Sequence, residues 1–290
     1  MPINFGSRLK ESFSKSGQLC LGIDPHPSIL DSWSLPDTLS GLEVFSKKII
    51  EAAVDRVGII KPQVAFYERF GSGGFKVLEQ VSEYAKEAKL ICIMDAKRGD
   101  IGSTMQGYFE AWLGKSAPFA ADALTVSPYL GFDSLLDVFS QAQELGRGIF
   151  VLAATSNPEG AALQTARKDD VTLAADIWNS LNRINSVTNS AQNTFGDFGA
   201  VVGATINFSK LGLGEIPLVK QKVGTPILSP GFGAQGAELT AARDIFGVAV
   251  DQVLFNVSRS VLETGPLGIG NSIDSAKKQL VIGLGSNHVE

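Results

Sequence analysis

The amino-acid sequence predicts an α/β fold, and two observations carry this prediction. Eight short, nearly continuous apolar runs occur along the chain, and longer amphipathic stretches separate them. A continuous apolar run is typical of a parallel strand that is covered on both faces. Eight strand–helix units in 290 residues predict a (β/α)8 TIM barrel, with residues 1–290 as a single domain. A doubly wound open sheet is the alternative, because its units look the same in sequence.

The predicted elements follow one another in chain order. Strands are expected at residues 19–24, 58–66, 90–97, 123–127, 148–156, 198–205, 225–231 and 253–259. Helices are expected between them, for example at 41–53, 74–87, 104–113, 134–144 and 171–189. We expect residues 27–40 to form a loop, residues 164–197 to form an elongated outer helix and a loop, and the tail 283–290 to fray.

Composition narrows the range of partners. The chain is 44% hydrophobic and carries a net charge of −5, and its Lys and Arg residues are scattered, so we expect no nucleic-acid partner. No segment approaches the ~20 apolar residues of a membrane span, so no membrane partner is expected. Cys20 and Cys92 lie within apolar runs, as core thiols of a reducing compartment would, which predicts a cytoplasmic protein.

Histidine chemistry has little support in this sequence. The two histidines are His26, which lies between prolines, and His288, which lies near the C-terminus. Neither has a His or Cys neighbour at metal-ligand spacing, so we expect no zinc site. We interpret His26 as a loop residue and His288 as a solvated tail residue, which leaves little for a Ser-His-Asp mechanism.

Polar residues mark the end of every predicted strand. A barrel enzyme collects its functional residues at the carboxyl ends of its strands. The polar ends are Asp24, Lys61, the group Asp95, Lys97 and Asp100, then Ser127, Ser156, Thr205, the segment 229–236, and Ser258 with Arg259. Loop polarity explains the Ser and Thr residues, but it does not explain a charge inside an apolar run such as Lys61.

The third predicted strand carries the densest group of charges. Alternation places Asp95 and Lys97 on one face, and Asp100 follows closely enough to fold back towards them. An amine between two carboxylates is held as ammonium, which is a poor nucleophile and a well-placed proton donor. A structural ion-pair cluster is the alternative interpretation.

The seventh and eighth strand ends predict a phosphate site. Gly231, Gly233 and Gly236 allow backbone amides to approach an anion closely. Arg259, on the next strand, offers a planar fork to phosphate oxygens. Barrels frequently bind phosphate at these two loops, although a plain glycine turn is the alternative.

Taken together, these motifs resemble those of the orotidine 5′-monophosphate decarboxylases. The resemblance rests on Asp95-x-Lys97-x-x-Asp100-Ile101-x-x-Thr104, Pro230-Gly231-x-Gly233-Ala234-Gln235-Gly236 and Arg259-Ser260. The segment from Lys61-Pro62-Gln63 to Phe66-Tyr67-Glu68 is similar to the longer bacterial subgroup of that family.

The resemblance implies a role for each matching residue. Asp24 would bind the ribose, Lys61 would join the charge network, Asp95 would face the substrate carboxylate, and Lys97 would protonate pyrimidine carbon 6. Asp100, Ile101 and Thr104 would reach into the neighbouring site of a homodimer. Ser156 would recognise the pyrimidine, Gln235 and Arg259 would hold the phosphate, and Pro230 and Gly231 would line the loop. Ser127 and Thr205 receive no role.

The implied reaction is the cofactor-free conversion of orotidine 5′-monophosphate to uridine 5′-monophosphate (UMP) in pyrimidine biosynthesis. One alternative is a magnesium-dependent sugar-phosphate decarboxylase or aldolase-like barrel of the same superfamily. That enzyme carries a glutamate metal ligand on its second strand, where this chain has Lys61. The other alternative is a barrel that binds a phosphorylated ligand without catalysis.

Overall fold

Eight parallel strands close into a barrel in the computed structural model, which describes residues 2–188 and 195–285. The barrel order is β1, β2, β3, β4, β5, β8, β9 and β10, and β10 pairs with β1 to close it. The strands are β1 Leu19–Ile23, β2 Ile59–Pro62, β3 Ile91–Arg98, β4 Ala123–Val126, β5 Gly148–Ala154, β8 Phe198–Val202, β9 Ile227–Ser229 and β10 Val253–Val257. The prediction of a (β/α)8 barrel is confirmed, and the alternative prediction of a doubly wound open sheet is wrong.

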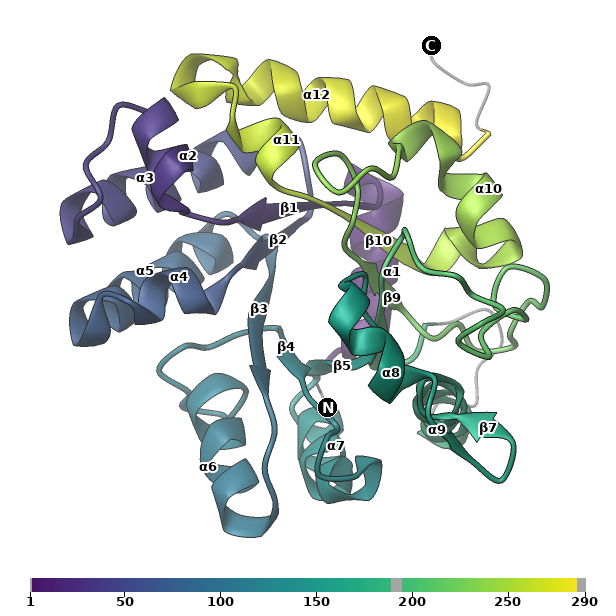
Figure 1. Ribbon diagram of the computed structural model, residues 1–290. Helices are drawn as coiled ribbons and strands as arrows, with labels where there is room; N and C mark the ends of the chain where they lie inside the picture. The colour runs from purple at the N-terminus through teal and green to yellow at the C-terminus, as the bar shows by residue number, and fades with distance from the viewer. Residues whose placement is uncertain (1, 189–194, 286–290) are drawn as a thin grey trace.

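Helices surround the strands (Figure 1). The α-helices are α1 Phe5–Ser16, α2 Pro27–Ser32, α3 Leu39–Ala53, α4 Val64–Glu68, α5 Gly71–Glu87, α6 Gly102–Trp112, α7 Leu136–Glu144, α8 Ala161–Gln164, α9 Leu173–Thr188, α10 Ala242–Phe246, α11 Arg259–Leu262 and α12 Gly265–Gly283. Short 3-10 helices are η1 Phe132–Leu135, η2 Pro158–Gly160, η3 Leu239–Ala241 and η4 Gly247–Gln252. No helix in the described ranges is long and apolar enough to cross a membrane.

The strands are apolar throughout because both of their faces are buried. In β1, Cys20 belongs to one hydrophobic cluster, whereas Leu19 and Leu21 belong to another. The cluster of Cys20 takes residues from all eight barrel strands and fills the barrel interior. Phe5 and Leu9 of α1 join this inner cluster, so α1 closes the end of the barrel where the strands begin.

Two helices form where the sequence analysis predicted none. Helix α1 was not among the expected elements, and α2 forms within residues 27–40, which were predicted to be a loop. The side chain of Asn4 caps α1 by accepting from the Ser7 N–H at 2.8 Å. His26 caps α2 by accepting from the Ser28 N–H at 3.2 Å, so this histidine has a structural role.

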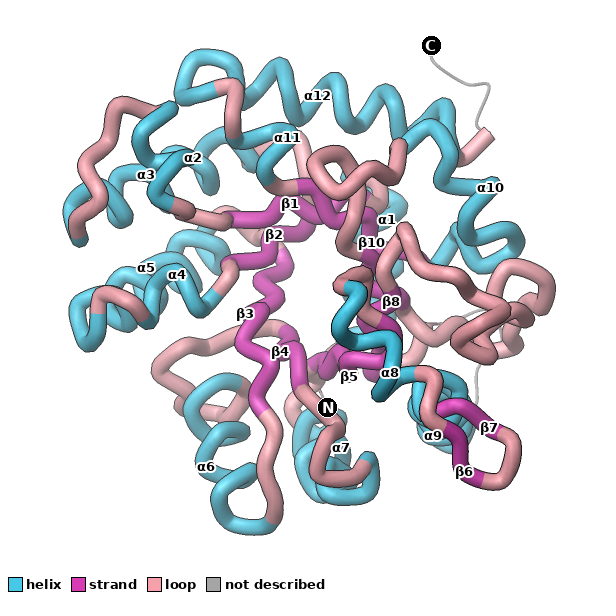
Figure 2. The backbone as a smooth tube through the Cα atoms, in the orientation of Figure 1, coloured by secondary structure: helices cyan, strands magenta, loops and turns pink. Residues whose placement is uncertain are grey.

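The connection between β5 and β8 also differs from the prediction. Residues Arg167–Lys168 and Val171–Thr172 form the antiparallel strands β6 and β7, which stand apart from the barrel (Figure 2). The turn between them places Asp169 and Asp170 at φ values of 49° and 65°. Aspartate tolerates this left-handed region, which tight hairpin turns require. The outer helix therefore begins at Leu173, two residues later than predicted, and residue 189 lies outside the described residues.

Candidate active site

The polar ends of the strands meet around a cavity of about 300 Å³. Most of the site residues predicted from the sequence line it: Asp24, Lys61, Asp95, Lys97, Ser156, Pro230, Gly231, Gln235 and Arg259. They come from the ends of β1, β2, β3, β5, β9 and β10, which are far apart in sequence. The prediction that these side chains converge at one end of the barrel is therefore confirmed.

Asp95 occupies the centre of the charged group. Its Oδ2 pairs with the Lys61 ammonium at 2.8 Å, and its Oδ1 pairs with the Lys97 ammonium at 2.5 Å. The sequence analysis expected one amine between two acids, but this chain places one acid between two amines. Burial by itself would raise the pKa of Asp95, but the charges of Lys61 and Lys97 outweigh it and lower that pKa well below its usual range.

Lys61 is the buried member of the group, with only 5% of its side chain exposed. Burial opposes its charge, yet the carboxylates of Asp95 and Asp24 together raise its pKa above the usual range. The ammonium form of Lys61 is thus fixed by its neighbours. Lys97 is 43% exposed and faces the cavity, where it can approach a ligand.

An irregularity in β3 positions Lys97. The register between β3 and β4 shifts between Met94 and Arg98, and Lys97 has a φ of +50°. A left-handed conformation costs a residue with a Cβ about 1–2 kcal/mol, so surrounding contacts must hold it. One such contact is the bond from the Lys97 N–H to Thr125 Oγ1, at 3.0 Å.

Sequence reasoning missed two neutral residues of this group, Gln63 and Thr125. Thr125 Oγ1 donates to Asp95 Oδ1 at 3.0 Å. The Gln63 amide is assigned the orientation that satisfies its neighbours, in which its nitrogen donates to Asp95 Oδ2 at 2.5 Å and its oxygen accepts from Lys97 Nζ at 3.3 Å. Two signals were present: Gln63 lies two residues after Lys61, and Thr125 is a lone hydroxyl in an apolar strand.

The glycine-rich segment after β9 forms a compact loop. Gly231, Gly233 and Gly236 have φ values of 117°, 75° and 99°, which favour glycine. The Gly236 N–H donates to the Gly233 carbonyl, and the Ala237 N–H donates to the Gly231 carbonyl. A side chain at Gly233 would lie 2.6 Å from the Cβ of Ser260, so the loop packs tightly against α11.

Other predicted ligand-binding residues border this loop. Ser156 Oγ donates to Gln235 Oε1 at 3.1 Å and so connects the end of β5 to the loop. Arg259 begins α11 and is exposed at the cavity. The arrangement places amide and guanidinium donors at one side of the cavity and the charged group around Asp95 at another.

Several buried polar atoms at the cavity lack a partner among the described residues. They are Asp24 Oδ1, Asn256 Oδ1 and Ser258 Oγ. Other buried polar atoms away from the cavity are unpaired too, so the three at the cavity mark only where a bound ligand could add hydrogen bonds. The sequence analysis had assigned Asp24 such a role and had assigned none to Asn256 or Ser258.

Three predicted site residues lie outside this cavity. Asp100 Oδ1 accepts from the Ile101 N–H at 2.8 Å, and no ion pair within the described ranges joins Asp100 to Lys97. The expectation that Asp100 folds back onto the lysine of its own chain is therefore wrong. Ile101 is 59% exposed, and Thr104 lies in the first turn of α6.

The cysteines contribute no reactive group. Cys20 and Cys92 are both buried free thiols, as predicted for core residues. Burial raises the pKa of Cys20 to about 12, so its thiol stays protonated at neutral pH.

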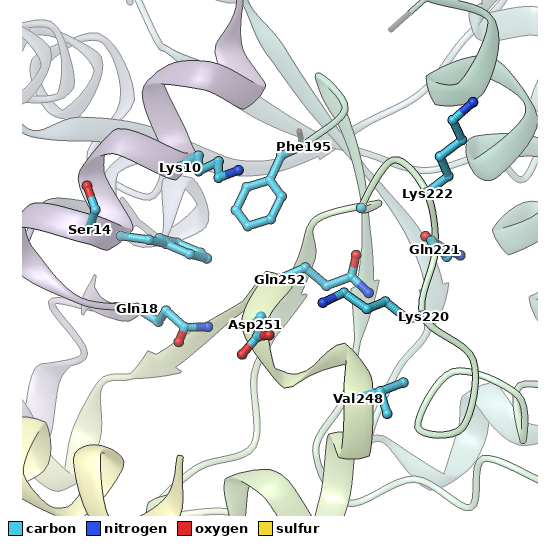
Figure 3. Close-up of a pocket in the computed structure, with 12 residues that line it drawn as sticks. Lys10, Ser14, Gln18, Phe195, Lys220, Gln221, Lys222, Val248, Asp251 and Gln252 are labelled. Carbon is cyan, nitrogen blue, oxygen red and sulfur yellow. The ribbon is translucent and has the colours of Figure 1, made fainter. Parts of the chain in front are cut away.

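A second cavity, of about 540 Å³, lies at the opposite end of the barrel (Figure 3). Residues of α1 and residues just before β1, β9 and β10 line it. Figure 3 shows Lys10 and Lys220 extending into this cavity from opposite sides, whereas Lys222 points away from it. Barrel enzymes act at the carboxyl ends of their strands, so the smaller cavity is the candidate active site.

Comparisons with known proteins show the family of this chain. The model of the Orotidine 5'-phosphate decarboxylase / HUMPS family matches residues 17–267, from just before β1 into α12. The orotidine 5'-phosphate decarboxylase of Streptomyces coelicolor is 48% identical over 263 residues, covering 90% of this chain and 91% of the relative. That of Corynebacterium glutamicum is 47% identical over 265 residues, covering 91% and 92%.

A solved structure is similar over nearly the whole chain. It is a Streptomyces avermitilis protein assigned as an orotidine 5'-phosphate decarboxylase, with a TM-score of 0.89 and 43% identity. The similarity covers 98% of this chain and 97% of that one. Sequence, fold and cavity lead to one conclusion: the chain belongs to the Orotidine 5'-phosphate decarboxylase / HUMPS family.

Proposed function

We propose that this chain converts orotidine 5′-monophosphate to UMP without a cofactor, and that Lys97 supplies the proton to pyrimidine carbon 6. The observation that carries the proposal is the Lys61–Asp95–Lys97 group at the edge of a cavity that also contains Arg259 and Gln235. The relatives named above support the choice of substrate.

In this proposal the substrate spans the cavity. Arg259 and Gln235 hold the phosphate, with Pro230 and Gly231 lining the loop. The unpaired Asp24 Oδ1 accepts from a ribose hydroxyl. Ser156 recognises the pyrimidine, which brings carbon 6 and its carboxylate towards Asp95 and Lys97. Binding energy from the remote phosphate then orients the reacting carbon.

In this proposal the chemical step uses protein groups alone. The bond between carbon 6 and the carboxylate breaks, carbon dioxide leaves, and the electron pair remains on carbon 6. The Lys97 ammonium gives a proton to that carbon, so an N–H bond breaks while a C–H bond forms. A fixed positive charge at the point where negative charge develops is the larger contribution to rate. Asp95 adds a smaller one by repelling the substrate carboxylate.

The proposal includes a homodimer with shared sites. Asp100, Ile101 and Thr104 would act in the partner's cavity, because they lie outside the cavity of their own chain. Exposed apolar side chains support an interface beside them: Tyr129 is 74% exposed and Leu130 is 53% exposed. These two residues follow β4, whose loop lies directly against the loop after β3 at Gly99.

The magnesium-dependent barrel is less consistent with this site. At the place on β2 where that enzyme needs an acidic ligand, Lys61 presents an ammonium paired to Asp95 at 2.8 Å. A cation there repels a divalent metal ion. Within residues 2–188 and 195–285, no group of three His, Cys, Asp or Glu side chains is arranged to hold a metal.

The test is an absorbance assay with orotidine 5′-monophosphate in excess EDTA. We expect full turnover in the chelator. Activity that disappears with EDTA and returns with magnesium would favour the metal-dependent barrel. A chain that binds UMP but turns over no substrate would favour the non-catalytic barrel.

A further inference from the structure

The carboxylate of Asp95 receives four hydrogen bonds from its own chain. Oδ1 accepts from Lys97 Nζ at 2.5 Å and from Thr125 Oγ1 at 3.0 Å. Oδ2 accepts from Lys61 Nζ at 2.8 Å and from the Gln63 amide at 2.5 Å. A carboxylate offers about four lone-pair sites, so these donors fill them. Asp95 is therefore held as a fixed negative charge with a defined plane.

Thr125 makes two of the contacts that define this geometry. Its hydroxyl donates to Asp95 Oδ1 and accepts from the Lys97 N–H, each at 3.0 Å. Because a hydroxyl has one proton, donation to the carboxylate leaves its lone pairs for the backbone N–H. The same atom thus fixes the acid and the backbone of the proton donor.

The backbone contact matters because Lys97 is in a conformation that it would not adopt unaided. Its φ of +50° lies in the left-handed region, at the point where β3 loses register with β4. Thr125 lies on β4, is 1% exposed and is not among the residues that line the cavity. It can therefore influence a ligand only through Asp95 and Lys97.

We propose that Thr125 is a positioning residue, which holds Lys97 and Asp95 in the geometry needed for proton transfer to the substrate. This inference rests on the function proposed above. A misplacement of about 1 Å in a reacting group can slow catalysis by ~100-fold. Loss of the Thr125 hydroxyl releases both of its partners and so reduces the rate of the chemical step.

The experiment is the substitution Thr125→Val, which replaces the Thr125 hydroxyl with a methyl group of similar size. For Thr125→Val we expect kcat to fall by about 10–100-fold. KM and the Kd of UMP should stay within about twofold, because phosphate contacts dominate binding. Thr125→Ser restores the hydroxyl and should recover kcat to within about threefold. If Thr125→Val does not fold, Thr125→Cys serves the same comparison, because a thiol is a weak donor and acceptor.

Thr225→Val is the matched control. Thr225 is also fully buried, accepts from Asn185 Nδ2 at 3.0 Å and donates to Asn182 Oδ1 at 2.7 Å, but it lies just before β9 at the other end of the barrel. The same change there should lower the unfolding temperature and leave kcat unchanged at temperatures where the protein is folded.

The outcomes separate this inference from the proposed function. Normal turnover by the wild-type chain, with a Thr125→Val kcat equal to that of Thr225→Val, would make Thr125 purely structural and overturn this inference alone. Failure of Thr125→Ser to recover kcat would also overturn it. Absence of turnover in the wild-type chain would overturn the proposed function and this inference together.

Discussion

At the carboxyl end of the barrel, the ammonium groups of Lys61 and Lys97 and the carboxylate of Asp95 are already paired before any ligand binds. Asp95 is 12% exposed as a side chain, and both of its ammonium partners lie within 2.8 Å. Removal of one partner from a buried pair typically destabilises a protein by about 3–5 kcal/mol, because the remaining charge is uncompensated. Burial of these three charges also carries a desolvation cost, which is expected where a protein places its chemistry.

Arg259 provides a direct test of the phosphate side of the cavity. Arg259→Ala should weaken binding of orotidine 5′-monophosphate and of UMP at least about tenfold, since charge-assisted bonds to phosphate contribute about 1.5–3 kcal/mol each. Calorimetric titration with UMP measures this change. Orotidine, which lacks the phosphate, is the control ligand and should bind the two proteins alike. Equal weakening of both ligands would mean that Arg259 has a structural role.

The placement of single residues at the cavity could be predicted where a charge interrupts an apolar strand, as at Lys61 and Asp95. The arrangement of the charges around Lys97 could not be predicted, because Asp100 turns away to accept from the Ile101 N–H. Gln63 and Thr125 were missed because amides and hydroxyls are common at strand ends. Their importance depends on pairing across β2, β3 and β4, which no local pattern records.

At the scale of elements, the barrel strands were predictable because each is buried on both faces. The hairpin of β6 and β7 could not be predicted, because two-residue strands are too short to show an alternation of apolar and polar residues. Helix α1 was missed although Asn4 caps it, and although Phe5 and Leu9 enter the inner hydrophobic cluster. Its covering role depends on closure of the barrel, which brings β8 and α1 together.

Asp197, just before β8, contributes to that contact. It is 1% exposed, and its Oδ1 accepts from the Gly6 N–H at 2.8 Å, in the first turn of α1. Burial raises the pKa of Asp197, although the Gly6 N–H and the charge of Arg8 oppose the shift. The folded state therefore binds a proton at pH values where the unfolded chain has released it, and stability falls as pH rises from about 4.

Asp197→Asn should remove this pH dependence, since an amide does not titrate. The free energy of unfolding of the variant, relative to the wild type, should rise as pH increases from about 4 through the folded pKa of Asp197. Urea unfolding at several pH values and one protein concentration measures it. A relative stability that falls with pH would contradict the assignment.

At the scale of the whole molecule, the closed barrel separates stability from function. The inner cluster and α1 fill and cover one end, while the other end carries the charged group and the glycine loop. Asp100, Ile101 and Thr104 are the predicted site residues that this arrangement leaves outside the cavity. In the proposed homodimer, a second copy of the chain would give them a site.

A complementation experiment tests the proposed sharing of sites. Lys97→Ala and Asp100→Ala homodimers should each be severely impaired. Unfolding and refolding them together at equal amounts makes about half of the dimers mixed, and each mixed dimer has one intact site. Roughly one quarter of all sites should then recover activity. Activity no greater than the average of the two separate variants would mean that Asp100 serves its own chain.

The most direct test of the whole account is the turnover of Lys97→Ala on orotidine 5′-monophosphate, with UMP affinity measured on the same sample. Lys97 is the proposed proton source, and the phosphate contacts at Arg259 and Gln235 are untouched by the change. We predict that turnover is abolished while the Kd for UMP stays within about tenfold of the wild-type value. Near-native turnover by Lys97→Ala would show that the proton comes from another group and would contradict the mechanism.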